Sequence, residues 1–434
     1  MEMTVAIAIG ILMFTLFIGV PIPFAFFGSG AYLIFAGGYD PGFLLPYGFA
    51  KMNSIVLLTI PLFIMAGGVM DKGGIGDRLV DVVDTIAGRI RGGLGVVTVV
   101  TCAIFGAVTG SSSATVSCIG SIMMPKLKQA GYPMGHSAAL LASSGVLGIL
   151  IPPSMLMILY AWMGNQSVLA CFLAAFVPGV ILTVLLSLVN LFLLRNNKDI
   201  AVSPSMDMAT TAKTFVSKSA KASPALMMPV IILGGIYGGI MTPTEAAAVA
   251  VLYAVPVAMF VYRGLKAKNL MYTLIESATT TGVIMAMMFA VMILSRLYIM
   301  ENLPDQIMHV LTSISDNKFV LLLMINVFML IMGMLMDDVS GVLLGTPILV
   351  PLIMKLGVDP IQFAAIMGVN LGMGNVTPPT APLLYLSGRI SGAPVTEMLK
   401  PTLYLILFAW LPTLLLTTYV PEVSLTLVHY LMGN

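Results

Sequence analysis

The chain has 434 residues, of which 59% are hydrophobic and only 9% are charged. An average soluble domain carries about 25% charged residues, so this composition excludes a soluble globular protein and predicts an all-α polytopic membrane protein. The formal net charge is only +2, and we expect no nucleic-acid partner.

Ten hydrophobic stretches are long enough to cross a bilayer, because a hydrocarbon layer of about 30 Å needs about 20 apolar residues. The first stretch has neither a basic segment before it nor a small-residue cleavage site after it, and we interpret it as a retained helix. A multi-pass chain is therefore expected. The ten predicted spans are 4–20, 21–38, 54–70, 138–163, 168–194, 225–240, 245–261, 280–299, 361–386 and 402–420.

Two further apolar segments, 92–126 and 319–354, are each interrupted near the middle by small or polar residues. The interruptions are 110–113 (Gly-Ser-Ser-Ser) and 337–341 (Asp-Asp-Val-Ser-Gly). The arms that follow have about 11 and about 13 residues, and an arm of 11 covers only about 16 Å as a helix. Such arms are too short to cross, so we predict two re-entrant hairpins with their tips near the middle of the membrane. Irregular backbone at that depth is tolerated only beside protein or a water-filled cavity.

The spans 138–163 and 361–386 each contain a proline pair followed by a hydroxyl residue. The triplets are Pro152-Pro153-Ser154 and Pro378-Pro379-Thr380, and they lie 226 residues apart. We interpret the spans as corresponding broken helices of an internal duplication, a pattern that points to the midplane binding site of a secondary transporter. The same offset superposes Pro125 on Pro351, Gly131 on Gly357, Ala138 and Ala139 on Ala364 and Ala365, and Gly148 on Gly374.

The duplication divides the chain into a first repeat, 1–194, and a second repeat, 225–434. They are joined by the polar linker 195–224, which contains five Lys or Arg and two Asp, so the positive-inside rule places it in the cytoplasm. Because each repeat has five spans, the two must be inverted relative to each other. The first hairpin then enters from the cytoplasm and the second from the periplasm. Four of the twenty cations fall on or near the outer side: Lys51, Arg296, Lys318 and Lys355.

The broken helices expose backbone groups that suit ions. A proline frees the carbonyl one turn before it, and the ends of half-helices carry unpaired carbonyls and amides. Carbonyl oxygens suit Na⁺, amides suit a carboxylate, and serine hydroxyls add oxygen ligands of the kind small cations prefer. The alternative is a purely structural kink. The candidate Na⁺ ligands of the first repeat are Ser111, Ser112, Ser113, Gly148 and Ser154.

The second hairpin carries acids where the first carries serines. An acid inside a membrane is a functional hypothesis by default, although Asp337 or Asp338 could hold a cation, accept a proton, or cap the following half-helix. Asn370 and Asn375 could orient a substrate or satisfy broken backbone, and Arg296 could attract an anion or extend to the interface. The candidate Na⁺ ligands of this repeat are Asp337, Gly341, Gly374 and Thr377. The candidate substrate residues of both repeats are Ser154, Asp338, Asn370, Asn375, Thr380 and Arg296.

Taken together, six segments resemble the large membrane subunit, DctM type, of tripartite ATP-independent periplasmic (TRAP) transporters of the ion-transporter superfamily. The resemblance implies an elevator-type transporter, in which a rigid scaffold carries a mobile domain built from the hairpins and broken helices. It pairs the first tip with the first break, and the second tip with the second break, as two Na⁺ sites. The segments are 17–21 (FIGVP), 60–68 (IPLFIMAGG), 106–114 (GAVTGSSSA), 148–154 (GILIPPS), 241–248 (MTPTEAAA) and 374–380 (GNVTPPT).

The same resemblance implies Na⁺-coupled uptake of small carboxylates across the bacterial inner membrane. It also implies two partners, a small four-helix membrane subunit as a separate chain and a periplasmic substrate-binding protein. Which acid is carried, and whether protons take part, stay open.

Two alternative functions remain. A single-component carboxylate transporter of the same superfamily, coupled to Na⁺ or H⁺, is the near alternative. A membrane enzyme is the distant one, and we expect none. Adjacent acids such as Asp337 and Asp338 project apart and do not form a shared-proton pair. The chain also contains no G-x-x-x-x-G-K-[ST] motif for ATP hydrolysis.

Overall fold

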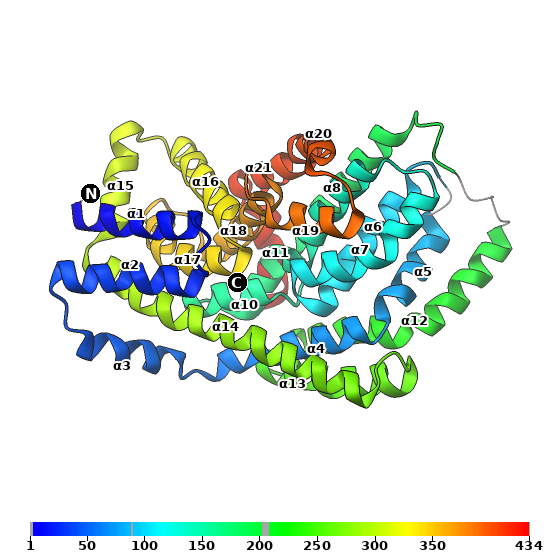
Figure 1. Cartoon of the computed structure of the whole chain (residues 1–434), viewed down its shortest axis with the longest axis horizontal. Coiled ribbons are helices and arrows are strands. Elements are labelled where there is room, and N and C mark those ends of the chain that lie inside the picture. Colours follow the sequence, from blue (N-terminus) through cyan, green and yellow to red (C-terminus); the bar gives the residue numbers. More distant parts are fainter. Residues whose placement is uncertain (1–2, 88–89, 202–207, 434) are drawn as a thin grey trace.

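The computed structural model describes residues 3–87, 90–201 and 208–433. Every regular element in these ranges is a helix (Figure 1). Eight helices there are long and apolar enough to cross a membrane, or nine when the bent pair 134–150 and 155–163 counts as one span. The prediction of an all-α, multi-pass membrane protein is confirmed. Part of the predicted linker, 202–207, lies outside the described residues.

The helices of the first half follow the predicted apolar stretches closely. The amphipathic segment after the third span, with charges at Asp77, Asp81 and Asp84, forms a separate short helix, α5. The helices of this half are α1 (Met3–Phe17), α2 (Ile22–Gly37), α3 (Pro41–Met52), η1 (Ile55–Leu58), α4 (Thr59–Lys72), α5 (Ile75–Ala87), α6 (Gly93–Thr109), α7 (Ser112–Gln129), α8 (Met134–Gly145), α9 (Leu147–Leu150), α10 (Met155–Met163) and α11 (Val168–Leu194).

In the second half, α13 starts at a capping box in which Thr242 and Glu245 satisfy each other's backbone amides. A short π-helical segment, η2, ends the span that begins with α13, and a second, η3, interrupts the span formed by α20 and α21. Its helices are α12 (Met208–Tyr237), α13 (Pro243–Pro256), η2 (Val257–Val261), α14 (Ala267–Met300), α15 (Leu303–Ile314), α16 (Lys318–Leu335), α17 (Asp338–Lys355), α18 (Pro360–Val376), α19 (Pro382–Ser391), α20 (Val395–Leu405), η3 (Ile406–Trp410), α21 (Leu411–Tyr419) and α22 (Glu422–Met432).

The second arms of the two hairpins are longer than the sequence predicts. Helices α7 and α17 have 18 residues each, about 27 Å at helical rise. The predicted lengths of about 11 and 13 were wrong because each helix begins at the tip itself, and α7 continues beyond Lys126 to Gln129. Arm length alone therefore does not make these segments re-entrant.

Helix bounds recur at the sequence offset of the duplication. Adding 226 to the bounds of α7 gives those of α17, and the same shift converts 134–150, which form α8 and α9, into α18. Both Pro-Pro peptide bonds, 152–153 and 378–379, are cis. The two halves thus share one order of tip, arm and broken helix.

The described end of the predicted linker is helical, since residues 208–224 belong to α12. Alanine and lysine are frequent in this segment, and both are good helix formers, so polarity alone did not mark a loop. Residues 195–201 precede it outside any helix, and the amide of Ala201 donates to the carbonyl of Ala130.

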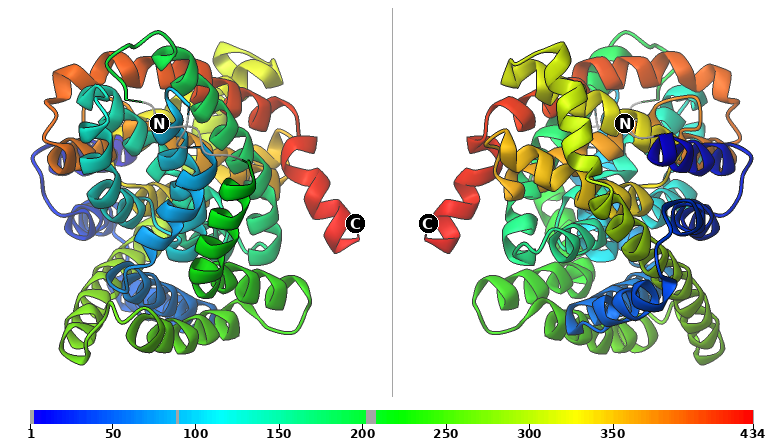
Figure 2. Two further views of the ribbon diagram at one scale, coloured as in Figure 1. Left: turned by 90° about the vertical axis from the view of Figure 1, so that its right-hand side faces the viewer. Right: turned by 90° about the vertical axis from the view of Figure 1, so that its left-hand side faces the viewer.

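The helices form two groups that lie side by side (Figure 1). One group contains α1 to α4, α13 and α14; α14 has 34 residues and packs against α2, α3 and α4. The other contains the two hairpins, the broken helices, α11, α20 and α21. The end views show α22 projecting from the main body with the C-terminus at its tip (Figure 2). The boundary between the groups follows α14, which also contacts α17.

Candidate functional site

Ser154 holds the first broken helix together. The chain bends by 49° between residues 134–150 and 155–163. The hydroxyl of Ser154 donates to the carbonyl of Ile149 over 2.6 Å and accepts from the amide of Met157 over 3.4 Å. Ser154 is fully buried, so it satisfies backbone groups on both sides of the break where water cannot reach them.

We expect Ser154→Ala to lower the stability of the protein. The substitution removes an N-cap, worth about 1 kcal/mol, and leaves a buried carbonyl without its partner, which costs a further ~1–3 kcal/mol. Thermal unfolding in detergent micelles measures the loss. Ser143→Ala is the matched control, because the buried Ser143 hydroxyl has no hydrogen-bond partner within the described residues. Equal melting temperatures for the two variants would contradict this role of Ser154.

The first hairpin tip lies directly against the first break. The carbonyl of Gly110 accepts a hydrogen bond from the amide of Met155 over 3.3 Å. A Cβ atom added to Gly148 would lie 2.7 Å from the carbonyl oxygen of Ser111, so only glycine fits there. Thr115 donates its hydroxyl to the same carbonyl over 2.7 Å. The structure therefore brings Ser111, Gly148 and the start of α10 together.

The second tip and the second break are joined in a related way. The amide nitrogen of Asn375, oriented toward the carbonyls of Gly333 and Met336, donates to them over 3.1 and 3.2 Å. A Cβ atom on Gly374 would lie 2.6 Å from the backbone of Gly333. Asn375 thus satisfies broken backbone, which was one of its two predicted roles. The hydroxyl of Thr377 donates within its own chain segment, to the carbonyl of Met373 over 2.6 Å.

The two tips also contact each other. Ser112 donates its hydroxyl to Asp338 Oδ2 over 2.6 Å, and both side chains are buried. Ser112 and Asp338 are 226 residues apart, so each is the counterpart of the other in the duplicated sequence. This hydrogen bond joins the two halves at their equivalent positions.

The adjacent aspartates point to different partners. Asp337 caps α17, accepting from the amide of Ser340 over 3.2 Å and from its hydroxyl, whereas Asp338 reaches the opposite tip. Gly341 lies in the first turn of α17 and packs against the side chain of Leu371. Of the two adjacent acids, Asp337 therefore caps a helix and Asp338 contacts the first tip.

A cavity of about 320 Å³ lies between the tips and α14. Ser111 and Ser113 line it from the first tip, with their hydroxyl oxygens 3.3 Å apart. Asp337 and Asp338 line it from the second tip, and Met155 contributes the start of α10. Four of the predicted site residues therefore face one space.

Helix α14 completes this cavity, and the sequence analysis missed its contribution. Thr279, Thr280 and Met287 line the wall. The threonine hydroxyls donate to carbonyls one turn earlier in the helix, which leaves their lone pairs available. The signal was visible as three consecutive threonines, 279–281, at the start of an apolar span.

A second cavity, of about 360 Å³, continues from the first. Ser111, Ser113 and Thr280 line both. It extends between α4 and α14 to Asp71, Lys72 and Glu276. The tips are therefore accessible from the end of α4 that the charge distribution predicts to be cytoplasmic.

Three predicted substrate residues lie away from the tips. Arg296 stacks over the ring of Tyr47, 5.5 Å from its centroid. Asn370 is buried and donates to Asn326 Oδ1 over 2.9 Å, and Thr380 is exposed. None of the three lines the cavity at the tips.

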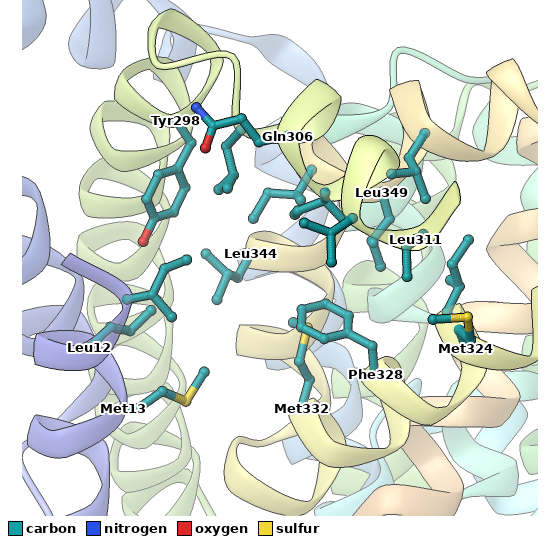
Figure 3. Close-up of a pocket in the computed structure, with 17 residues that line it drawn as sticks. Leu12, Met13, Tyr298, Gln306, Leu311, Met324, Phe328, Met332, Leu344 and Leu349 are labelled. Carbon is teal, nitrogen blue, oxygen red and sulfur yellow. The ribbon is translucent and has the colours of Figure 1, made fainter. Parts of the chain in front are cut away.

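A separate apolar cavity of about 280 Å³ lies between α1, α14, α15 and the hairpin α16–α17 (Figure 3). Leu12, Phe328 and Leu344 are among its lining residues, and of the described residues only Tyr298 and Gln306 bring polar side chains to it. With no charged group in its lining, this cavity does not suit an organic anion or a cation.

Membrane spans, paired broken helices and a cavity lined by serine, threonine and aspartate side chains define this protein as a multi-pass membrane transport protein. The chain belongs to the family described as "Tripartite ATP-independent periplasmic transporter, DctM component", whose match covers residues 9–423. The resemblance seen in the sequence is thereby confirmed, and the relatives are permease subunits of transporters.

Three relatives illustrate the range of the family. The chain is 36% identical over 383 residues to a C4-dicarboxylate TRAP transporter large permease protein, DctM, of Pseudomonas aeruginosa, covering 88% of each chain. It is 35% identical to the isethionate TRAP transporter permease protein DctMQ of Oleidesulfovibrio alaskensis, covering 95% of this chain but 65% of that longer protein. It is 30% identical to the sialic acid TRAP transporter large permease protein SiaM of Vibrio cholerae, covering 96% and 97%.

Two solved structures share the fold at low sequence identity. The YdaH transporter of Alcanivorax borkumensis superposes with a TM-score of 0.59 at 16% identity, covering 87% of each chain. MtrF of Neisseria gonorrhoeae superposes with a TM-score of 0.57 at 12% identity, covering 87% of this chain and 84% of that one.

Proposed function

We propose that this chain is the large transport subunit of a Na⁺-coupled, binding-protein-dependent importer of small organic acids in the bacterial inner membrane. The observation that carries the proposal is the meeting of both hairpin tips, through Ser112 and Asp338, beside a cavity that both tips line. Each tip also contacts its own broken helix. One space is thus lined by groups from both halves, as a central transport site requires.

The ligand chemistry of the tips supports Na⁺ as the coupling ion. The groups there are hydroxyls, backbone carbonyls and carboxylates, the hard oxygen ligands that small cations prefer. In the proposal, Ser111 to Ser113 with Gly148 hold one ion, and Asp337 with Gly341, Gly374 and Thr377 hold a second.

The start of α10 supports a carboxylate substrate. Met155, its first residue, lines the cavity, and a helix N-terminus favours negative charge. The serine hydroxyls of the first tip would donate to the same group. Relatives named for C4-dicarboxylates and for sialic acid suggest a small organic acid, and isethionate extends the candidates to a sulfonate.

Three cavities along α14 support an elevator-type mechanism. Their linings include α14 residues 273–280, 279–287 and 292–299 in turn. The first two adjoin, whereas between the second and third the hydroxyl of Ser340 in the second hairpin contacts Met287 Sδ at 3.0 Å. The arrangement suits a site open to the cytoplasm and closed to the outside, which a movement of the hairpins along α14 would reverse.

Partner dependence tests the proposal against a single-component transporter. Three proteoliposome preparations should be compared with succinate, isethionate and sialic acid as candidate substrates. The first contains this chain alone, the second adds the small membrane protein encoded beside it, and the third also has the cognate binding protein outside. We expect uptake only in the complete system. Uptake by the chain alone would assign it to the single-component class.

A further inference from the structure

The third cavity lies at the opposite end of α14 from the cytoplasmic opening. Its volume of about 770 Å³ is within the range of about 300–1,000 Å³ typical of small-molecule sites. Its walls come from α3, α10, α14 and α17, so both helix groups contribute. Lining residues with polar side chains are Tyr47, Lys51, Ser54, Trp162, Asn165, Gln166, Ser295 and Thr346.

One cation, Lys51, lines this cavity, and a second, Arg296, lies over the ring of Tyr47, which also lines it. The Lys51 Nζ and Arg296 Cζ atoms lie 5.8 and 5.5 Å from the centroid of that ring. Contacts of this kind attract a cation to the ring face. Lys51 also lines the cavity, whose lining contains no Asp or Glu among the described residues.

The two charges have no acidic partner. Neither Lys51 nor Arg296 belongs to an ion pair within the part of the chain that the structure describes. A cation at the end of a span often simply extends to the membrane interface. Two cations of that kind need not lie near each other. Here both cations lie over one aromatic ring that lines the cavity. A cleft lined by one sign of charge concentrates ions of the other sign.

We propose that this cavity is an anion-binding vestibule, with Tyr47, Lys51 and Ser295 in its lining and Arg296 beside Tyr47. It holds the organic anion at the outer side, before the anion reaches the hairpin tips. The assignment of the outer side and of the organic anion rests on the proposed function. The binding of anions by the cavity does not depend on it. The ligand class is a small carboxylate or sulfonate, attracted by the two cations and oriented by amide and hydroxyl groups.

Trp162 offers a direct test that does not require transport. The chain has two tryptophans; Trp162 lines the vestibule and is partly exposed, whereas Trp410 is fully buried. Quenching of fluorescence by iodide, relative to quenching by neutral acrylamide, reports the local potential. We expect the Lys51→Gln/Arg296→Gln double variant to lower this ratio about twofold, since two nearby charges are removed.

Two controls make the quenching experiment specific. Trp162→Phe should abolish the iodide-sensitive signal, because the remaining Trp410 is inaccessible. Lys268→Gln removes an exposed cation at the other end of α14 and should leave the ratio unchanged. An iodide-to-acrylamide ratio that is the same in wild type and in the double variant would overturn the proposal.

Transport then tests the role of the vestibule in uptake. In the complete system, the double variant should raise the KM for the organic anion about tenfold while kcat is retained, because the tips are intact. An unchanged KM would exclude a role in substrate capture. If the reconstituted system carries no organic acid at all, the proposed function fails, whereas the quenching result still decides whether the cavity attracts anions.

Discussion

Asp338→Asn is expected to reduce Na⁺-driven uptake about 100-fold. Asp338 is buried at the contact between the tips, where its carboxylate accepts from the Ser112 hydroxyl and from the amide of Val339. A hydrogen bond to a charged group is worth ~1.5–3 kcal/mol, and in the proposed site the same carboxylate also contributes charge to the cation and substrate space. Initial uptake rates in proteoliposomes measure the loss.

The control for Asp338 is Asp316→Asn, since Asp316 is an exposed acid in the same half. Adding Ser112→Ala completes a double-mutant cycle. Because the two side chains share one hydrogen bond, their effects on uptake should be non-additive. Additive losses, or near-normal uptake in Asp338→Asn, would show that the contact between the tips has no role in transport.

Gly148→Ala is expected to abolish uptake and to lower stability. A Cβ atom there would meet the backbone of Ser111 at 2.7 and 3.1 Å and Thr115 Oγ1 at 2.7 Å. Two of these atoms are backbone, so the first tip must move away from the broken helix. Overpacking of this kind costs ~1–3 kcal/mol, and the displaced tip would no longer form the first proposed ion site. Thermal unfolding and Na⁺-dependent uptake measure the two consequences.

Gly30→Ala provides the matched comparison for this prediction. Gly30 is buried in α2, but a Cβ atom there would meet nothing within 4 Å. This variant should retain its melting temperature and its uptake. If Gly148→Ala behaved in the same way, the close contact between the first tip and the first break would not be needed for function.

Much of the fold could be predicted because its signals are local. Apolar length marks the spans, and proline pairs mark the broken helices. The sequence offset of 226 residues relates tips and breaks, and the helices of the two halves repeat at this offset. Capping of a helix by Asp337 is one of its predicted roles, because Asp is a favoured residue at the start of a helix. The structure shows this cap on α17.

The contacts across the site could not be predicted, because they join residues distant in sequence. The hydrogen bond between Ser112 and Asp338 depends on how the two tips pack. Asn370 was a candidate substrate residue, but its neighbour is Asn326 on α16. The threonines of α14 line the cavity only because this helix lies beside the tips. Arg296 lies on the same helix but does not line that cavity, because its place along α14 sets its depth.

We propose that ions bound at the hairpin tips drive uptake, and this coupling can be measured. Uptake of organic acid should be measured in the complete reconstituted system under an inward Na⁺ gradient and under a proton gradient alone, for wild type, Ser112→Ala and Asp337→Ala. We predict uptake that requires Na⁺ in wild type and is strongly reduced in both variants, with the assembly still folded. Uptake driven equally well by protons, or unchanged Na⁺ dependence in both variants, would contradict coupling through Na⁺ bound at the hairpin tips.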